Sequence, residues 1–172
     1  VIVTPQPQCP KYDTTLYDAC SSLSKRWIKW DHSTPNPFSK SDLDEFSATQ
    51  VQGFLQSILG SETPLPQDKV QIMEEVYGFN SYRNAEIKFR WLRICIQSRL
   101  KDQLPIALQF VTDVGRMKFI RPIYRDLYNW EEARAEAIET FKRNRPYMMI
   151  YIWKIDTNNN AGQFVVANAN SK

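Results

Sequence analysis

Residues 84–98 restrict the fold more than any other segment, because their apolar side chains nearly encircle a helix. At about 100° per residue, Ile87, Trp91 and Cys95 fall on one side of that helix, while Phe89 and Ile96 fall on the opposite side. A helix that is apolar on two sides needs packing neighbours on both. The segment is therefore predicted to lie in the middle of a stack of helices and not at its edge.

Six further segments carry apolar residues at helical spacing between residues that typically start or end helices. Ser47 can accept hydrogen bonds from the first backbone N–H groups of a helix, and Gly60 is a typical stop. Proline fits a first helical turn, which predicts helix starts at Pro66, Pro105 and Pro122. The seven expected helices cover residues 13–30, 47–60, 66–78, 84–98, 105–115, 122–128 and 130–142.

Seven helices with short turns and no alternating strand pattern predict an all-α fold of antiparallel helix pairs, stacked as a bundle or a superhelix. No exact sequence repeat decides between these two arrangements. The chain has 172 residues, of which 42% are hydrophobic, so a single domain with one core is expected. We assign residues 1–12 to a lead-in linker, 13–146 to the helical domain and 147–172 to a poorly ordered tail.

The tail differs in character from the helical region. It opens with the apolar, uncharged stretch Tyr147–Trp153 and continues into an Asn-rich end, so it is predicted to be strand or unstructured. The same stretch is the longest apolar run, far shorter than the roughly 18 residues that a membrane span needs, and no membrane association is expected. The chain opens with Val1 and lacks a secretory signal, which indicates a piece of something longer.

Cysteine and histidine usage argues against a disulfide scaffold and against a metal site. Cys9, Cys20 and Cys95 are odd in number and include no C-x-x-C pair, and the lone histidine, His32, lies in a loop without the H-E-x-x-H pattern of zinc peptidases. Free thiols fit a reducing compartment. We expect the cytoplasm, with the nucleus or nucleolus as alternatives.

Positive charge is concentrated in one part of the chain. Residues 83–125 hold ten Lys or Arg side chains against three Asp or Glu, although the whole chain carries a net charge of only +3. This asymmetry indicates either an anionic ligand or partner, or simply the solvated faces of helices. Nucleic-acid binding is the weaker interpretation, because the aromatic residues Phe89 and Trp91 fall on predicted buried faces.

A pair of cations stands between two expected helices, in the run Gly115–Pro122. In an extended loop Arg116 and Lys118 point to one side, where a planar guanidinium and a mobile ammonium suit an anionic end of a ligand. The alternative is two exposed cations in a surface turn, and the spacing alone favours it.

Three runs resemble one known family. They are Glu74–Asn80, Asn84–Ser98 and Gly115–Phe119 with Arg121–Pro122, and they look like the C-terminal helical domain of leukotriene hydrolase and its zinc aminopeptidase relatives. The resemblance covers about residues 10–148, with aminopeptidase O and then aminopeptidase B as the nearest members. It implies an armadillo/HEAT-like α-α superhelix that packs against a zinc peptidase domain and closes one side of its substrate channel.

The resemblance also implies a role for the cation pair. In the family, the Arg and Lys of Gly-Arg-Met-Lys bind the carboxylate of the peptide or fatty-acid substrate, which carries over to Arg116 and Lys118 and favours the ligand interpretation. Nothing in the chain matches the family's zinc ligands, catalytic Glu or Gly-rich substrate motif, so the chain holds no catalytic or metal-binding residue and should not hydrolyse peptides alone.

These implications define the expected function and its alternative. The chain is expected to be a non-catalytic domain whose partners are a zinc-containing catalytic domain of the same protein and a peptide substrate. The alternative is a stand-alone helical-repeat scaffold that binds another protein.

Overall fold

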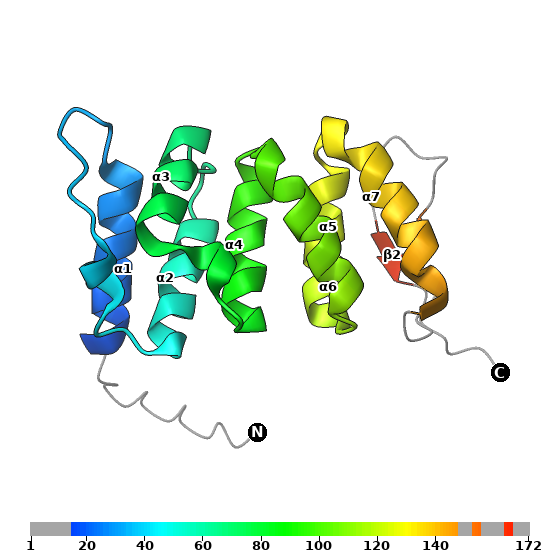
Figure 1. Ribbon diagram of the computed structural model, residues 1–172, viewed down its shortest axis with the longest axis horizontal. Helices are drawn as coiled ribbons and strands as arrows, with labels where there is room; N and C mark the ends of the chain where they lie inside the picture. The colour runs from blue at the N-terminus through cyan, green and yellow to red at the C-terminus, as the bar shows by residue number, and fades with distance from the viewer. Residues whose placement is uncertain (1–14, 148–152, 156–163, 167–172) are drawn as a thin grey trace, which may run out of the picture.

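The computed structural model describes residues 15–147 together with two short strands (Figure 1). The seven α-helices are α1 (Thr15–Lys29), α2 (Ala48–Leu59), α3 (Gln67–Tyr77), α4 (Ala85–Gln97), α5 (Leu104–Asp113), α6 (Met117–Tyr128) and α7 (Glu131–Asn144). Short 3-10 turns lie between or after them, namely η1 (Lys40–Leu43), η2 (Phe79–Ser81), η3 (Lys101–Gln103) and η4 (Arg145–Tyr147).

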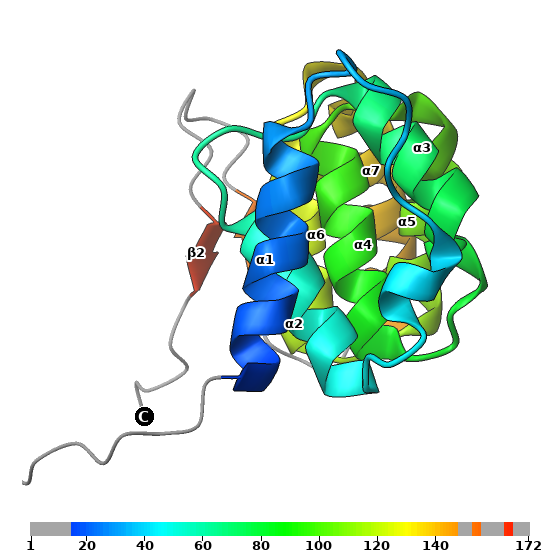
Figure 2. The same ribbon diagram turned by 90° about the vertical axis from the view of Figure 1, so that its left-hand side faces the viewer.

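The helices form two layers that advance from one end of the molecule to the other. Helices α1, α2, α4 and α6 line up in one layer, and α3, α5 and α7 form the second (Figures 1 and 2). From α2 onward, consecutive helices alternate between the two layers and run antiparallel, whereas α1 and α2 lie in one layer and run in the same direction (Figure 1). The expected all-α, armadillo/HEAT-like arrangement is confirmed.

Helix α4 separates two hydrophobic cores, as its sequence predicts. Ile87, Trp91 and Cys95 pack into the core shared with α1, α2 and α3. Leu92 and Ile96, on the opposite face, pack into the core shared with α5, α6 and α7. Because α4 is covered on both sides, it sets the spacing between the two halves of the stack.

The predicted ends of α2, α3 and α4 are confirmed. The Ser47 side chain accepts a hydrogen bond from the backbone N–H of Gln50, and the Asn84 side chain accepts one from that of Glu86. Gly78 follows α3 with φ of 64°, a left-handed conformation that glycine adopts without steric cost.

The expected start of α6 at Pro122 is wrong, because the helix begins five residues earlier and Pro122 lies inside it. Phe119, Ile120 and Ile123 are buried on one face, and this apolar stripe starts the helix before the proline. Proline cannot donate to the carbonyl of Lys118, so α6 lacks that one bond. Burial of the stripe outweighs its loss.

The first turn of α1 also differs from expectation. Leu16 belongs to the apolar stripe predicted for this helix, yet its side chain is 65% exposed, whereas Cys20, Leu23 and Trp27 further along are buried. Helix α1 stands at the end of the stack and packs mainly against α2 (Figure 1). A terminal helix has fewer neighbours to cover its ends.

The strands β1 (Trp153–Ile155) and β2 (Phe164–Val166) pair antiparallel, with Lys154 opposite Val165. They lie within the predicted tail. The linker of residues 1–12 and most of the tail lie outside the described residues, so those two assignments stay predictions. Within the described part of the chain, no helix has the length and apolar character that crossing a membrane requires.

A buried lysine ties α3 to the end of α1. Lys69 is 7% exposed, and its Nζ donates to the backbone carbonyls of Trp27 at 3.3 Å and Ile28 at 3.1 Å. The last carbonyls of a helix have no partner in the helix itself, and the C-terminal end of the helix dipole favours a cation. Lys69 therefore acts as a C-terminal cap supplied by another helix.

Lys69→Met is expected to lower the free energy of unfolding by about 1–3 kcal/mol, because methionine keeps the buried length but leaves two carbonyls without a donor. Urea denaturation of the chain and its variant measures this. Lys142→Met, at an exposed position of α7, is the matched control. Equal stability of Lys69→Met and the control would contradict the capping role.

Candidate functional site

The predicted cation pair lies at the start of α6 and not in an extended loop. Arg116 is the N-terminal cap residue of α6, with φ of −83° and ψ of 119°, and Lys118 lies in the first turn. Both side chains are exposed. The expectation of an extended loop is wrong because the helix begins at Met117, but both cations still stand at a helix N-terminus. That end carries partial positive charge and unpaired N–H groups.

One aromatic ring brings the two cations together. The Arg116 guanidinium lies 5.8 Å from the centroid of the Phe119 ring, and the Lys118 ammonium lies 4.7 Å from it. Both distances are within the range of cation–π attraction. Phe119 is itself only 3% exposed, so the core holds the ring that both cations contact.

Lys118 already has a carboxylate partner. Its ammonium pairs with Glu86 of α4, and Glu86 also binds Arg90 at 3.0 Å. The hydrogen bond from Lys118, and then that from Arg90, holds the pKa of the Glu86 carboxyl below its ordinary value. Glu86 thus neutralises Lys118 before any ligand arrives.

A second aromatic ring extends the site onto α4. Phe89 lies 5.2 Å from Phe119, centroid to centroid, and bridges α4 to α6. The guanidinium groups of Arg90 and Arg93 lie 6.0 Å and 5.7 Å from the Phe89 ring. Arg93 is occupied by Asp126, with Nε 2.6 Å from the carboxylate.

Arg116 is the exception among these cations, because no carboxylate of the described residues pairs with it. An exposed guanidinium beside an uncapped helix N-terminus can bind a carboxylate through two parallel hydrogen bonds. The part of the chain that the structure describes contains no group of three or more His, Cys, Asp or Glu side chains that could hold a metal ion. The site is therefore suited to binding an anion, and no hydrolytic step is assigned to it.

Sequence reasoning missed three members of the site, Glu86, Phe89 and Phe119. The sequence predicts a buried face for Phe89, places Phe119 only in the run between two expected helices, and gives Glu86 no particular role. The separation of 32 residues between Glu86 and Lys118 leaves no local signal. The position of Glu86 in the first turn of α4, on the side that faces α6, becomes evident only from the packing.

The Glu86–Lys118 pair should make stability depend on pH. A lowered folded-state pKa means that the stabilisation is present above the ordinary Glu value of 4.5 and is lost as the pH falls through the lowered pKa. Glu86→Gln is expected to be less stable than the wild type by ~0.5 kcal/mol at pH 7, since solvent screens such pairs, and the difference should be smaller at pH 3. Urea unfolding at both pH values measures the difference.

Glu139→Gln removes an exposed carboxylate of α7 and controls for the change in net charge. A Glu86→Gln penalty that is the same at pH 7 and pH 3 would show that the ion pair does not contribute.

Comparison with known proteins agrees with this fold. The family described as "Leukotriene A4 hydrolase, C-terminal" matches residues 46–155. Leukotriene A-4 hydrolase of Xenopus laevis is 47% identical over 142 residues, covering 83% of this chain and 23% of the relative. Leucine aminopeptidase 2 of Neurospora crassa is 33% identical over 141 residues, covering 82% of this chain and 20% of the relative.

Solved structures show the same fold. The native yeast LTA4 hydrolase superposes with a TM-score of 0.72 at 24% identity, over 83% of this chain and 25% of that one. The chain spans between a fifth and a quarter of the length of the curated relatives. The particular nearness to aminopeptidase O stays a prediction. The family resemblance itself is confirmed, and the chain belongs to the family of leukotriene A4 hydrolase C-terminal domains.

Proposed function

We propose that this chain is the non-catalytic C-terminal domain of a zinc aminopeptidase, and that Arg116 anchors the carboxylate of the peptide substrate. The observation that carries the proposal is the position of Arg116, exposed at the start of α6 and without a carboxylate partner among the described residues. Removal of N-terminal amino acids is assigned to a catalytic domain outside this chain. That domain also supplies the zinc, since the described residues offer no metal ligand set.

The two cations have different roles in this proposal. Arg116 offers a planar fork that matches a carboxylate in a bidentate way, and no internal carboxylate competes for it. Lys118 is paired with Glu86, so it adds positive potential and only a secondary contact. Phe119 sets the position of both.

The proposal also places this chain against its catalytic domain. The curated relatives are about four to five times as long as the matched region, which leaves room for a catalytic domain in each. A carboxylate anchor functions only if the cleaved bond is held at a set distance from it. We therefore propose that the edge of the stack at which α6 begins closes one side of the substrate channel.

The proposed location is a reducing compartment, with the cytoplasm first and the nucleus or nucleolus as alternatives. Cys20 and Cys95, the two cysteines that the structure describes, are buried free thiols, which supports this part of the proposal.

Arg116→Ala in the complete enzyme is expected to lower kcat/KM for peptide substrates by about 30-fold or more. Loss of one partner of a desolvated charged contact costs roughly 2–5 kcal/mol. Lys118→Ala should have a smaller effect, because Glu86 already occupies the ammonium. Zinc content is measured in parallel and should not change. Near-normal kcat/KM for Arg116→Ala would contradict the anchoring role.

Arg143→Ala, at an exposed position of α7, is the matched control for loss of one arginine. A substrate with an amidated C-terminus provides the complementary test, because it should be cleaved poorly by the wild type and equally by Arg116→Ala. If instead this chain neither shows activity nor restores activity to a separately made catalytic domain, the scaffold alternative is favoured.

A further inference from the structure

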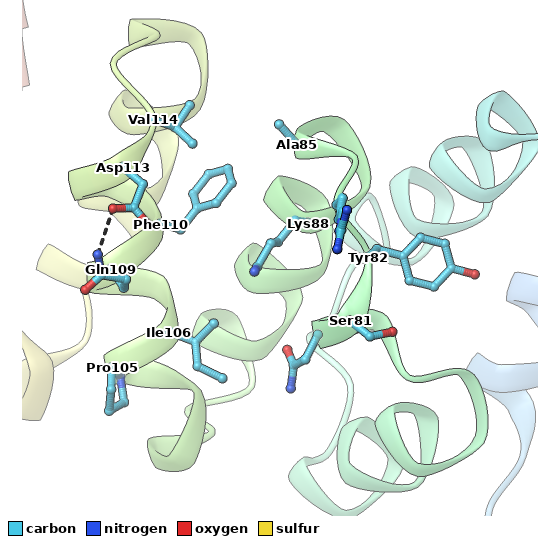
Figure 3. A pocket seen from close by; sticks show the side chains of 12 residues that line it. Ser81, Tyr82, Ala85, Lys88, Pro105, Ile106, Gln109, Phe110, Asp113 and Val114 are labelled. Atoms are coloured by element: carbon cyan, nitrogen blue, oxygen red, sulfur yellow. Dashed lines mark hydrogen bonds between the residues drawn. The ribbon is translucent and has the colours of Figure 1, made fainter.

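A second candidate site lies between α4 and α5. It is a groove of about 630 Å³, a volume typical of small-ligand and short-peptide sites. Neither Arg116 nor Lys118 lines it. The lining side chains come from the η2 turn, the start of α4 and one face of α5 (Figure 3), and they are Asn80, Ser81, Tyr82, Arg83, Ala85, Lys88, Pro105, Ile106, Gln109, Phe110, Asp113 and Val114.

The α5 wall of the groove is a continuous helix face. Five of its residues, from Pro105 to Asp113, recur at the spacing of one side of a helix and extend about 12 Å along the axis, and Val114 follows directly after α5. That length accommodates about four residues of an extended peptide. The wall alternates apolar and polar groups, since Gln109 stands between Ile106 and Phe110, and Asp113 follows Phe110 (Figure 3).

Lys88 brings a positive charge to the groove that no carboxylate neutralises among the described residues. Its half-buried side chain points from α4 into the space facing α5 (Figure 3). No carboxylate of the described residues pairs with Lys88, because Glu86 on the same helix binds Lys118 and Arg90. Asp113, across the groove, instead accepts a hydrogen bond of 2.7 Å from Gln109. An ammonium beside apolar walls is stabilised when an anion enters.

Further polar groups are available along the groove. The Asn80 side-chain oxygen accepts from Trp91 Nε1 at 3.0 Å, which orients the amide and leaves its nitrogen as a donor. Arg83 adds a second, exposed cation to the lining. A fatty acid needs one polar end and otherwise apolar walls, whereas a peptide needs polar partners at intervals, as this groove provides.

We propose that the α4–α5 groove binds an extended peptide segment in which an acidic residue is flanked by aliphatic residues. The acidic side chain pairs with Lys88, and the aliphatic side chains contact Ile106 and Phe110. This site is separate from the proposed substrate anchor and does not depend on it. Its occupant is a segment of a protein partner and not the peptide substrate.

The test uses the full chain and a fluorescent pentapeptide, Ala-Leu-Glu-Leu-Ala, with a dye at its N-terminus and an amide at its C-terminus. The amide removes the terminal carboxylate that Arg116 would bind. Fluorescence anisotropy should show that this peptide binds about five to ten times more tightly than its Gln-containing counterpart, as one charge-assisted pair implies. Lys88→Gln should abolish that preference, and Lys142→Gln should preserve it.

Two further variants locate the bound peptide. Ile106→Asp should weaken both peptides, because it places a charge on the apolar wall, and Arg116→Ala should leave both affinities unchanged. Circular dichroism and the urea midpoint confirm that each variant is folded. Undetectable binding at millimolar peptide concentration, or equal affinity for the two peptides, would overturn the proposal. So would a preference for the Glu-containing peptide that survives Lys88→Gln, or loss of binding in Arg116→Ala. A simple fatty acid that displaces the peptide with higher affinity would also overturn it.

Discussion

Burial of α4 on both faces is the constraint on which the rest of the structure depends. Trp91 is fully buried on one side and Leu92, the next residue, is fully buried on the other. A helix with two apolar faces cannot slide or rotate without exposing one of them, because each face is matched to a different core. The rotation of α4 therefore determines which of its polar residues meet α6 and which meet α5.

The site at the start of α6 follows from that rotation. With both apolar faces covered, Glu86 is directed at Lys118, and Phe89 is directed at Phe119. One carboxylate then serves Lys118 and Arg90 together, while Arg116 retains its full charge for a ligand. The same rotation turns Lys88 toward α5. Glu86 and Lys88 lie two residues apart on α4, yet Glu86 neutralises Lys118 of α6 while Lys88 faces α5 without a carboxylate partner among the described residues.

Much of the fold could be predicted from the sequence, because helix periods, caps and stops are local. Ser47, Gly78 and Asn84 mark the ends of helices through bonds made within a few residues. The start of α6 could not be predicted from local signals, since Pro122 is a valid first-turn residue. The helix begins at Met117 instead because Phe119 is buried against other helices. Arg116 and Lys118 came from a family resemblance. Their aromatic and acidic neighbours depend on contacts between helices, for which a single sequence holds no signal.

Pro122 has a consequence for how the start of α6 moves. Since proline has no N–H, the backbone of Lys118 is not connected to the next turn by the usual bond. The first turn of α6 can then separate from the remainder at a lower free energy than an unbroken helix allows, and its amide hydrogens exchange with solvent sooner. The residues that present Arg116 are tied to the core through the buried side chains of Phe119 and Ile120, while the backbone there lacks one hydrogen bond. Small shifts of the guanidinium can follow the position of a bound anion while Ile123 and Leu127 stay packed.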